Sequence, residues 1–314
     1  QPRERHRLGN VVQCQPPNND LAGAWYEERA IEHCKVHLDR TIQQAQPKCI
    51  LSLGGTALRT LTGWEGITQY RGYATQTRYG PVLGGFHPSY IRRGKSPLLP
   101  TLSRDLQLAL RIANGTFTQY QGHPSFIPPT YQTHPSIDEA WSFYYRAKDS
   151  PQLTLVYDIE NPEAAEQDED EREDFYNNPI VQIQFSLAKH EGIAFPWEGE
   201  YIEIAKKLLA LENPKAGHNV WTYDNGVLYG QHGISPVGVV HDTLCMFHHL
   251  YPDLEAGLQK AVSLFDFPFP WKHLAGENLA WYGCADVDAP HWLLEKVPEQ
   301  LKKKGLWDDS LINN

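Results

Sequence analysis

The first 113 residues alternate between amphipathic helical stretches and short apolar runs. Hydrophobic residues recur at helical spacing, which predicts helices over residues 25–46, 57–61 and 102–113. Two apolar runs of strand length, 48–53 and 81–86, lie between these helices, and two glycines follow the first run directly. A strand, a glycine turn and a helix in this order indicate an α/β fold.

Residues 114–150 differ in composition from the sequence on either side. They are rich in Pro, Gly, Thr and Gln and lack strong periodicity, which predicts a linker. A short helical pattern at 137–147 ends this segment. We therefore expect the chain to divide into two domains here.

From residue 153 the pattern changes to strands followed by helices. Strands are predicted at 153–158, 180–185, 192–195 and 237–241. In the second strand hydrophobic residues alternate with Gln182 and Gln184, so the two kinds lie on opposite faces. Helices are predicted at 201–211, near 225–229, and through most of the remaining chain. This order favours an α/β domain with a mixed sheet and helices on its faces.

The overall composition limits the class of protein. A length of 314 residues fits about two domains, and a hydrophobic content of 41% can supply their cores. No run of about 18 apolar residues occurs, which excludes a membrane-spanning helix. The five cysteines are odd in number and widely spread, which favours a reducing cytoplasm over a disulfide framework. The chain opens with Gln1 instead of methionine, so we expect a fragment or a processed product.

The net charge of −10 by itself argues against nonspecific binding to nucleic acid. However, residues 163–174 hold eight acidic residues against one arginine, a net charge of −7. The rest of the chain is close to neutral, so the total charge is a poor guide to the substrate.

Three acidic signatures follow one another in the second half of the chain. They are Asp158-Ile159-Glu160, a segment from Asn219 to Asp224, and a segment from Tyr282 to Asp286. Four carboxylates and a phenol can hold two divalent metal ions about 3.5–4 Å apart over a phosphodiester. Each signature alone has an ordinary explanation: a solvated strand end, a helix N-cap, and a surface pair on a helix.

The predicted elements bring these groups together. Asp158 and Glu160 are two positions apart in a strand, so both carboxylates point to one face. Tyr282 and Asp286 are four positions apart on a predicted helix and share one side of it. Asp224 begins the helix that follows the second signature. Hard cations such as Mg²⁺ prefer oxygen ligands of this kind, and a phenol beside them is placed to orient an attacking water.

Residues 151–292 resemble the DnaQ-like 3′–5′ exonucleases whose last motif carries a tyrosine, above all the proofreading domain attached to family A DNA polymerases. Shorter matches at 217–219, 241–243, 251–254 and 271–273 support this resemblance. It implies a ribonuclease H-like fold and a bound pair of Mg²⁺ or Mn²⁺ ions. By the same resemblance Tyr282 positions the nucleophilic water, Asn219 contacts DNA, and the metal ligands are Asp158, Glu160, Asp224 and Asp286.

Two points qualify this resemblance. Ribonuclease D-type and helicase-linked exonucleases share these motifs, so RNA remains open as a substrate. The acidic insertion after Glu160 departs from the family, and its charge would repel phosphate. We therefore expect the insertion to project away from the site or to lack order.

A different set of features occupies the first hundred residues. Residues 10–14 (Asn-Val-Val-Gln-Cys) have the pattern of a strand that ends at a cysteine, and Cys34 follows on a helix. The glycine turn after Leu53, then Arg71-Gly72, then His87-Pro88-Ser89 come next. In this order they resemble the iron–sulfur-containing uracil-DNA glycosylases over residues 8–113. The resemblance implies part of a three-layer α/β domain.

That family extrudes a base from the helix and reads its Watson–Crick edge. Asn10 matches the residue that binds the uracil edge, and His87 matches the residue that stabilises the departing uracil anion. The resemblance further implies contacts to the DNA minor groove and two of four iron–sulfur ligands. The residues concerned are Ser89, Arg92 and Arg93 for the groove, and Cys14 and Cys34 for the cluster.

In that family several features stand ahead of the part that this chain matches, and the sequence from Gln1 onward does not include them. They are the Gly-Glu-x-Pro-Gly-type motif that activates water, an aromatic that stacks on uracil, and two more cysteines. Because two cysteines cannot hold a 4Fe–4S cluster alone, we expect the cluster only in a longer parent chain. Otherwise Cys14 and Cys34 are buried thiols and His87 is a loop histidine. His123 and His134, in the linker, are expected to be incidental.

These features give one leading hypothesis. We expect a uracil-glycosylase-like part in 1–113, a linker in 114–150, an exonuclease in 151–292 and a helical extension in 293–314. The protein would trim single-stranded 3′ ends of DNA, uracil-containing ends included, in a bacterial or phage-infected cell. It would act in repair or proofreading as a piece of a longer phage-type polymerase. The alternatives are a uracil-recognising module without glycosylase activity, an exonuclease that acts on RNA, and an active glycosylase in the full-length parent.

Overall fold

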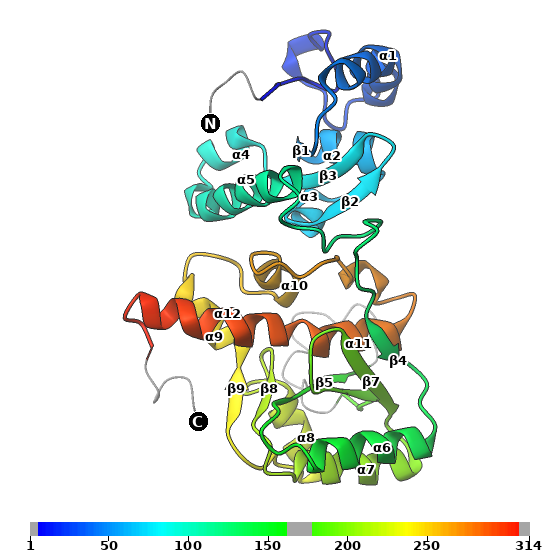
Figure 1. The fold of residues 1–314 in the computed structure, drawn as a ribbon, viewed down its shortest axis with the longest axis vertical. Helices are drawn as coiled ribbons and strands as arrows, with labels where there is room; N and C mark the ends of the chain where they lie inside the picture. Colours follow the sequence, from blue (N-terminus) through cyan, green and yellow to red (C-terminus); the bar gives the residue numbers. More distant parts are fainter. Residues whose placement is uncertain (1–5, 162–177, 308–314) are drawn as a thin grey trace. The chain divides into compact units, whose positions relative to one another are not determined.

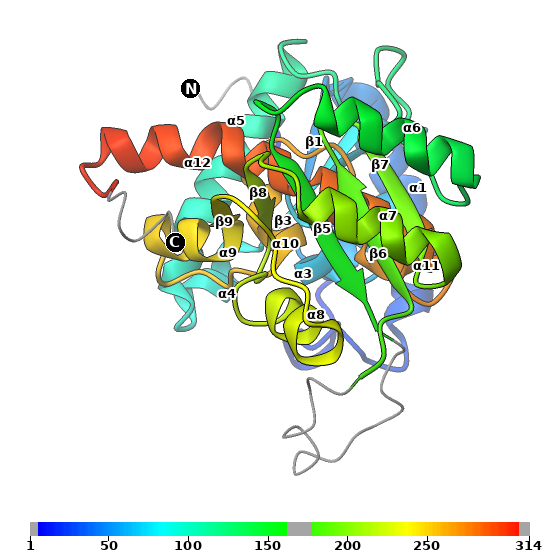
Figure 2. The ribbon, with the colours of Figure 1, turned by 90° about the horizontal axis from the view of Figure 1, so that it is seen from below.

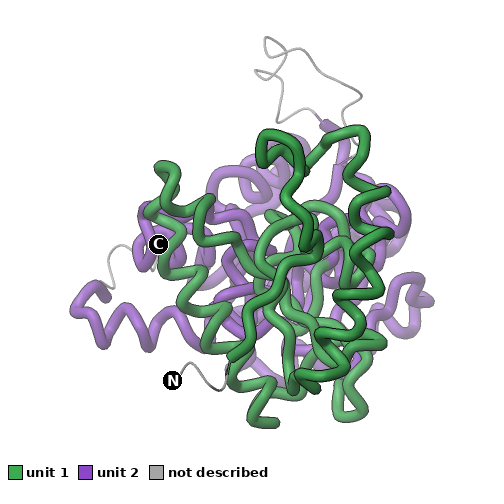
Figure 3. The backbone as a smooth tube through the Cα atoms, turned by 90° about the horizontal axis from the view of Figure 1, so that it is seen from above, with its two compact units in different colours: residues 1–126, 268–270 green, residues 127–267, 271–314 purple. Residues whose placement is uncertain are grey.

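A computed structural model describes residues 6–161 and 178–307. The chain forms two compact units, Gln1–Phe126 with Pro268–Pro270, and Ile127–Phe267 with Trp271–Asn314 (Figure 3). The acidic segment 163–174 lies outside the described residues, and so does the expectation about its placement. Within the described ranges, every helix is too short or too polar to cross a membrane.

The first unit is built on a small mixed sheet with strand order β1-β3-β2. Strand β3 (Gly80–Gly85) pairs in parallel with β1 (Ile50–Leu53) and antiparallel with β2 (Ala74–Thr77). The side chains of β3 alternate between two helix layers. Val82 packs with α1 (Glu27–Ala45) and α2 (Gly55–Thr62), whereas Leu83 packs with α5 (Leu99–Ala113). The unit also contains the short helices α3 (Ile67–Tyr70) and α4 (Pro88–Arg92) and the 3-10 turns η2 (Pro17–Asn19) and η3 (Ser96–Leu98).

The glycine turn predicted after the first strand is present. Gly54 has a φ of 95°, a conformation that favours glycine, and α2 begins at the next residue. The strand predicted before Cys14 is not: residues 10–14 have no regular secondary structure. Val11 packs beside Leu38 and Val82 through its side chain, but its backbone joins no sheet.

The second unit contains a mixed sheet of six strands in the order β4-β7-β6-β5-β8-β9 (Figure 1). Its centre is an antiparallel meander of β5 (Leu155–Glu160), β6 (Gln182–Ser186) and β7 (Glu191–Pro196). The strands β8 (Lys215–Gly217) and β9 (Val240–Asp242) extend it in parallel beyond β5. An antiparallel meander followed by parallel strands matches the predicted α/β fold class with a mixed sheet.

Helices cover both faces of this sheet. On one face α6 (Ile137–Lys148) and α7 (Gly199–Leu209) lie together (Figure 2), and α8 (Asp224–His232) shares their core. On the other face lies α11 (Leu279–Asp288), followed by α12 (Pro290–Lys303). The remaining helices of the described unit are α9 (Thr243–Leu250), α10 (Leu258–Val262) and the 3-10 turn η5 (Lys272–Leu274).

The predicted linker contains two elements of the second unit. The short strand β4 (Thr130–Gln132) pairs in parallel with β7, and α6 buries Ala140 and Phe143 in the main core. A capping box at Ser136 and Glu139 begins α6. Residues 127–148 therefore belong to the second unit rather than to a linker.

Candidate active site

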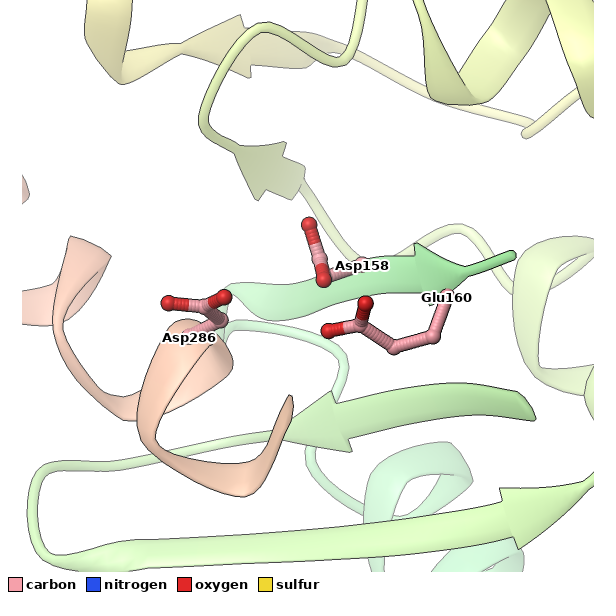
Figure 4. A group of neighbouring side chains, drawn as sticks. All are labelled: Asp158, Glu160 and Asp286. Carbon is pink, nitrogen blue, oxygen red and sulfur yellow. The ribbon is translucent and has the colours of Figure 1, made fainter. Parts of the chain in front are cut away.

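Alternation along β5 separates the core from the candidate site. Tyr157 and Ile159 enter the core under α6 and α7, so Asp158 and Glu160 project from the opposite face toward α11. There Asp286 meets them. Carboxylate oxygens of Asp158, Glu160 and Asp286 all lie within 4.8 Å of one another (Figure 4). The structure thus brings the first and third signatures together.

Asp224, the carboxylate of the second signature, is tied directly to the first. It is the first residue of α8, only 2% exposed, and its Oδ1 accepts a hydrogen bond from the backbone N–H of Ile159 at 3.0 Å. Its oxygens are not among the group within 4.8 Å. Asp224 therefore lies beside that group and contacts the backbone of β5 between Asp158 and Glu160.

A second buried aspartate fixes the loop that leads to α8. Asp242 accepts hydrogen bonds from the backbone N–H groups of Asn219 at 2.9 Å and Trp221 at 3.1 Å. It also caps α9 by accepting from the N–H of Leu244 at 2.9 Å. Asn219 has a φ of 73°, which asparagine tolerates better than most residues. The loop geometry that presents Asp224 thus depends on Asp242.

Helix α11 carries Tyr282 and Asp286 one turn apart, as their spacing predicts. A lysine bridges them: Lys272 Nζ lies 2.6 Å from the Tyr282 hydroxyl and 2.6 Å from Asp286 Oδ2. The other oxygen of Asp286 accepts a hydrogen bond from the indole N–H of Trp271 at 2.7 Å. Beyond the short match at 271–273, the sequence indicates no role for Trp271 or Lys272, because neither stands at a diagnostic spacing from a carboxylate.

Close packing sets the distance between α11 and the sheet. Gly283 lies against Gln184, and a Cβ at position 283 would come within 2.4 Å of the Gln184 amide nitrogen. Gln184 pairs with Asp158 across β5 and β6, so both side chains occupy the face under α11. A glycine at this position therefore lets the helix approach closely enough for Asp286 to reach Asp158 and Glu160.

Burial and mutual repulsion dominate the electrostatics of the carboxylates. Burial, reinforced by the charges of Asp224 and Glu160, raises the pKa of Asp158 well above its ordinary value. Burial and then repulsion from Asp286 raise the pKa of Glu160 to about 8. Burial raises the pKa of Asp224 to about 7, although the hydrogen bond from Ile159 opposes this shift. Cationic groups therefore compensate the carboxylates only in part.

Lysine 272 supplies part of that compensation. Burial disfavours its charge, but the Asp286 carboxylate and the Tyr282 phenol more than offset this effect and raise the pKa of Lys272. Glu160 Oε1 is buried and has no hydrogen-bond partner among the described residues. An unpaired buried carboxylate oxygen beside two further carboxylates fits a hard divalent cation. The residues present would hold one or two such ions through Asp158, Glu160, Asp224 and Asp286.

The candidate residues of the first unit are arranged differently. Cys14 is exposed and Cys34 is buried. The Cys34 sulfur accepts a hydrogen bond from the Gln13 N–H at 3.4 Å, which lowers the pKa of Cys34, and the Cys14 thiol, hydrogen-bonded to Cys34, has a raised pKa. The structure thus brings these two cysteines together.

The loop after β3 is organised by His87. Its Nδ1 accepts a hydrogen bond from the Ser89 N–H at 3.1 Å and so caps α4. Arg93 donates to the carbonyl of Ser89 at 3.1 Å, and Arg92 and Arg93 are both exposed. Asn10, at the other end of the predicted uracil site, is exposed and lies outside any helix or strand.

Comparison with known proteins supports the resemblance of the N-terminal part. The family model of the uracil DNA glycosylase superfamily matches residues 2–110. Over 97 residues the chain is 37% identical to the type-4 uracil-DNA glycosylase of Thermotoga maritima, a match that covers 30% of this chain. The chain spans about half the length of this curated relative, since the match covers 48% of the glycosylase.

Comparison with solved structures gives weaker similarities. Escherichia coli RNase D, an exoribonuclease involved in structured RNA processing, is 15% identical with a TM-score of 0.43, over 59% of this chain and 48% of that chain. The catalytic core of RRP6 from Trypanosoma brucei is 13% identical with a TM-score of 0.44, over 74% and 61%. Brucella melitensis NrnC with bound Mg²⁺ is 17% identical with a TM-score of 0.41, over 52% and 81%. The functional argument therefore rests on the residues of this chain.

Proposed function

We propose that the second unit is a two-metal-ion 3′–5′ exonuclease that hydrolyses DNA phosphodiesters from a single-stranded 3′ end. The observation that carries the proposal is the convergence of Asp158, Glu160 and Asp286 within 4.8 Å. Asp224, fastened to the same strand, supplies the fourth carboxylate. This set of oxygen donors suits phosphodiester hydrolysis by a pair of divalent ions.

Each group of the site has a role in this proposal. Bound divalent ions would polarise the scissile phosphate and activate a water. Asp158, Glu160, Asp224 and Asp286 would hold those ions. The Tyr282 phenol, on the same side of α11 as Asp286, would hydrogen-bond the attacking water and fix its direction.

We infer DNA as the substrate from the other half of the chain. Residues 2–110 match a superfamily of uracil-DNA glycosylases, which supports a shared DNA strand as the substrate of both parts. In this proposal the chain acts in DNA repair or proofreading, within a longer phage-type polymerase in the cytoplasm. The loop with Ser89, Arg92 and Arg93, and the Asn219 side chain, would contact DNA.

The test is hydrolysis of a 5′-labelled single-stranded DNA with Mg²⁺ or Mn²⁺. We expect a ladder that shortens from the 3′ end, and little shortening of an RNA strand of the same sequence. Asp158→Ala and Glu160→Ala should each lower the rate at least about 1,000-fold. Glu203→Ala, a surface carboxylate paired with Lys206 on α7, is the matched control and should leave the rate unchanged. Unchanged activity in both site variants would eliminate the exonuclease assignment, and faster cleavage of the RNA would redirect it to RNA.

A second candidate function concerns the first unit. We propose that it recognises uracil through Asn10 and His87 and holds the base without releasing it, and the family match over residues 2–110 supports this recognition. We expect tighter binding to uracil-containing than to thymine-containing single strands, with no abasic sites formed. Equal affinity for the two strands would contradict this function. Abasic sites would show instead that the unit is an active glycosylase.

A further inference from the structure

Lys272 contacts one carboxylate of the candidate site and the phenol beside it. Its ammonium contacts the Tyr282 hydroxyl and Asp286 Oδ2, each at 2.6 Å, and lies 4.4 Å from the centre of the Tyr282 ring. The lysine is thus the cation that links the phenol to the carboxylate. An exposed ion pair of this length would contribute little to the free energy of unfolding. This one, however, joins two groups of the proposed reaction centre.

The backbone around Lys272 is held in place. The side-chain oxygen of Gln259, on α10, accepts hydrogen bonds from the N–H groups of both Trp271 and Lys272, at 2.7 and 2.8 Å. The Trp271 side chain is fully buried and donates its indole N–H to Asp286 Oδ1. The two oxygens of Asp286 therefore receive hydrogen bonds from adjacent residues of one fixed turn.

The donor chemistry of an ammonium restricts what the phenol can do. A lysine ammonium only donates hydrogen bonds, whereas a phenol both donates and accepts. At the contact with Lys272 the Tyr282 oxygen must therefore accept. Its O–H is left to donate to another oxygen, which makes the phenol a donor toward the site.

The same ammonium opposes metal binding. It contacts Asp286 Oδ2, one of the two oxygens through which Asp286 would bind a divalent ion, and like charges at short range repel. Loss of the lysine charge should therefore leave Asp286 more available to a divalent ion, even as the phenol loses its anchor. Turnover should therefore fall while metal binding becomes tighter, whereas a general loosening of the structure would weaken both.

We propose that Lys272 is a positioning residue of the hydrolytic site: it acts through Tyr282 by holding the phenol as a hydrogen-bond donor, and it competes with divalent metal for Asp286. The inference rests on the proposed exonuclease function of the second unit. It extends that function by assigning a role to a residue outside the acidic signatures.

The test combines turnover with metal binding for Lys272→Met, Tyr282→Phe and the double variant. Each single change should lower kcat on 5′-labelled single-stranded DNA about 10- to 100-fold. The double variant should be no slower than Tyr282→Phe by more than about twofold, because both changes remove the same interaction. In calorimetric titration without DNA, Mn²⁺ should bind Lys272→Met about tenfold more tightly than the wild type. Lys206→Met, which removes a partly exposed lysine on α7, is the control and should change neither quantity.

Two results would overturn the inference. Additive losses in the double variant would mean that Lys272 does not act through Tyr282. Unchanged or weaker Mn²⁺ binding to Lys272→Met would mean that the lysine only supports the fold. Circular dichroism and the thermal melt of this variant, compared with those of the wild type, show how far its fold has changed. If the wild type shows no hydrolysis, the proposed function fails, whereas the Mn²⁺ titration still decides whether Lys272 and the metal compete.

Discussion

The Asp224 carboxylate accepts a 3.0 Å hydrogen bond from the backbone N–H of Ile159, the residue between Asp158 and Glu160. The second acidic signature is thereby attached to the strand that carries the first. Asp224 thus has two functions that can be separated by substitution: a charge beside the other carboxylates, and an acceptor for a buried N–H.

Two substitutions at this position separate those functions. Asp224→Asn keeps an oxygen for the Ile159 N–H but removes the charge, so we expect activity to fall at least about 100-fold with little change in stability. Asp224→Ala also leaves the N–H unsatisfied, and should lower the free energy of unfolding by about 1–3 kcal/mol. Urea denaturation and the exonuclease assay check both. Equal stability of the two variants would contradict the proposed acceptor role.

Asp242 should matter for stability and, through Asn219 and Trp221, for the placement of Asp224. Asp242→Ala removes an acceptor of three backbone N–H groups, so we expect a loss of about 2–4 kcal/mol in the free energy of unfolding. Asp253→Ala, at an exposed position, is the control and should change it by less than about 0.5 kcal/mol. A similar loss in both variants would argue against a special role for Asp242.

The raised carboxylate pKa values predict a pH-dependent stability in the absence of metal. The folded-state pKa values of Asp224 and Glu160, about 7 and about 8, lie above those of an unfolded chain, about 4. Between these limits the folded protein binds more protons than the unfolded chain. The contribution of these two carboxyl groups to the free energy of unfolding is therefore fully present below about pH 4 and is lost as the pH rises to about 8. Urea denaturation in EDTA should show the decline, and Glu160→Gln should make it shallower.

Divalent metal should reverse that decline. Carboxylates bind metal only when deprotonated, so Mn²⁺ should raise the melting temperature more at pH 8 than at pH 6. Glu160→Gln, with one ligand fewer, should show a smaller increase at both values. Equal Mn²⁺ effects in the wild type and in the variant would contradict a role for Glu160 as a ligand.

Gly283 provides a test of helix placement. In Gly283→Ala the new methyl group would overlap Gln184, which should cost about 1–3 kcal/mol of stability and move Asp286 away from Asp158. Gly230→Ala, on α8, places its methyl group in open space and should stabilise the protein by about 0.5–1 kcal/mol. Adding Gln184→Ala to Gly283→Ala should recover part of the lost stability. No recovery would mean that the overlap is relieved elsewhere.

The candidate site was predictable where local periodicity controls it. Two-residue alternation placed Asp158 and Glu160 on one face of β5, and helical spacing placed Tyr282 and Asp286 on one side of α11. Lys272 was not predictable, because its position depends on Gln259 and on a turn without a repeating pattern. Gln184 was correctly placed opposite the hydrophobic face, but α11 covers it there and its side chain is fully buried.

The fold was less predictable where strands are short or where a partner strand is decisive. The three-residue strands β4 and β8 carry too few positions for an alternating pattern, and their pairing is fixed by the rest of the sheet. Residues 10–14 have the composition of a strand, but in the described part of the first unit no strand pairs with them. Because strand propensity alone does not form a strand without a partner, this segment is a loop.

Pairing of β4 with β7 affects where the chain can be shortened. A polypeptide that starts at residue 151, where the nuclease signatures begin, would lose β4 and α6 while keeping every carboxylate. The backbone amides and carbonyls of β7 would then face solvent, as a template for other β-chains, and the apolar surface under Phe143 would be uncovered. Such a truncated protein should precipitate on expression, whereas a version that begins at or before Ile127 keeps this margin of the sheet covered.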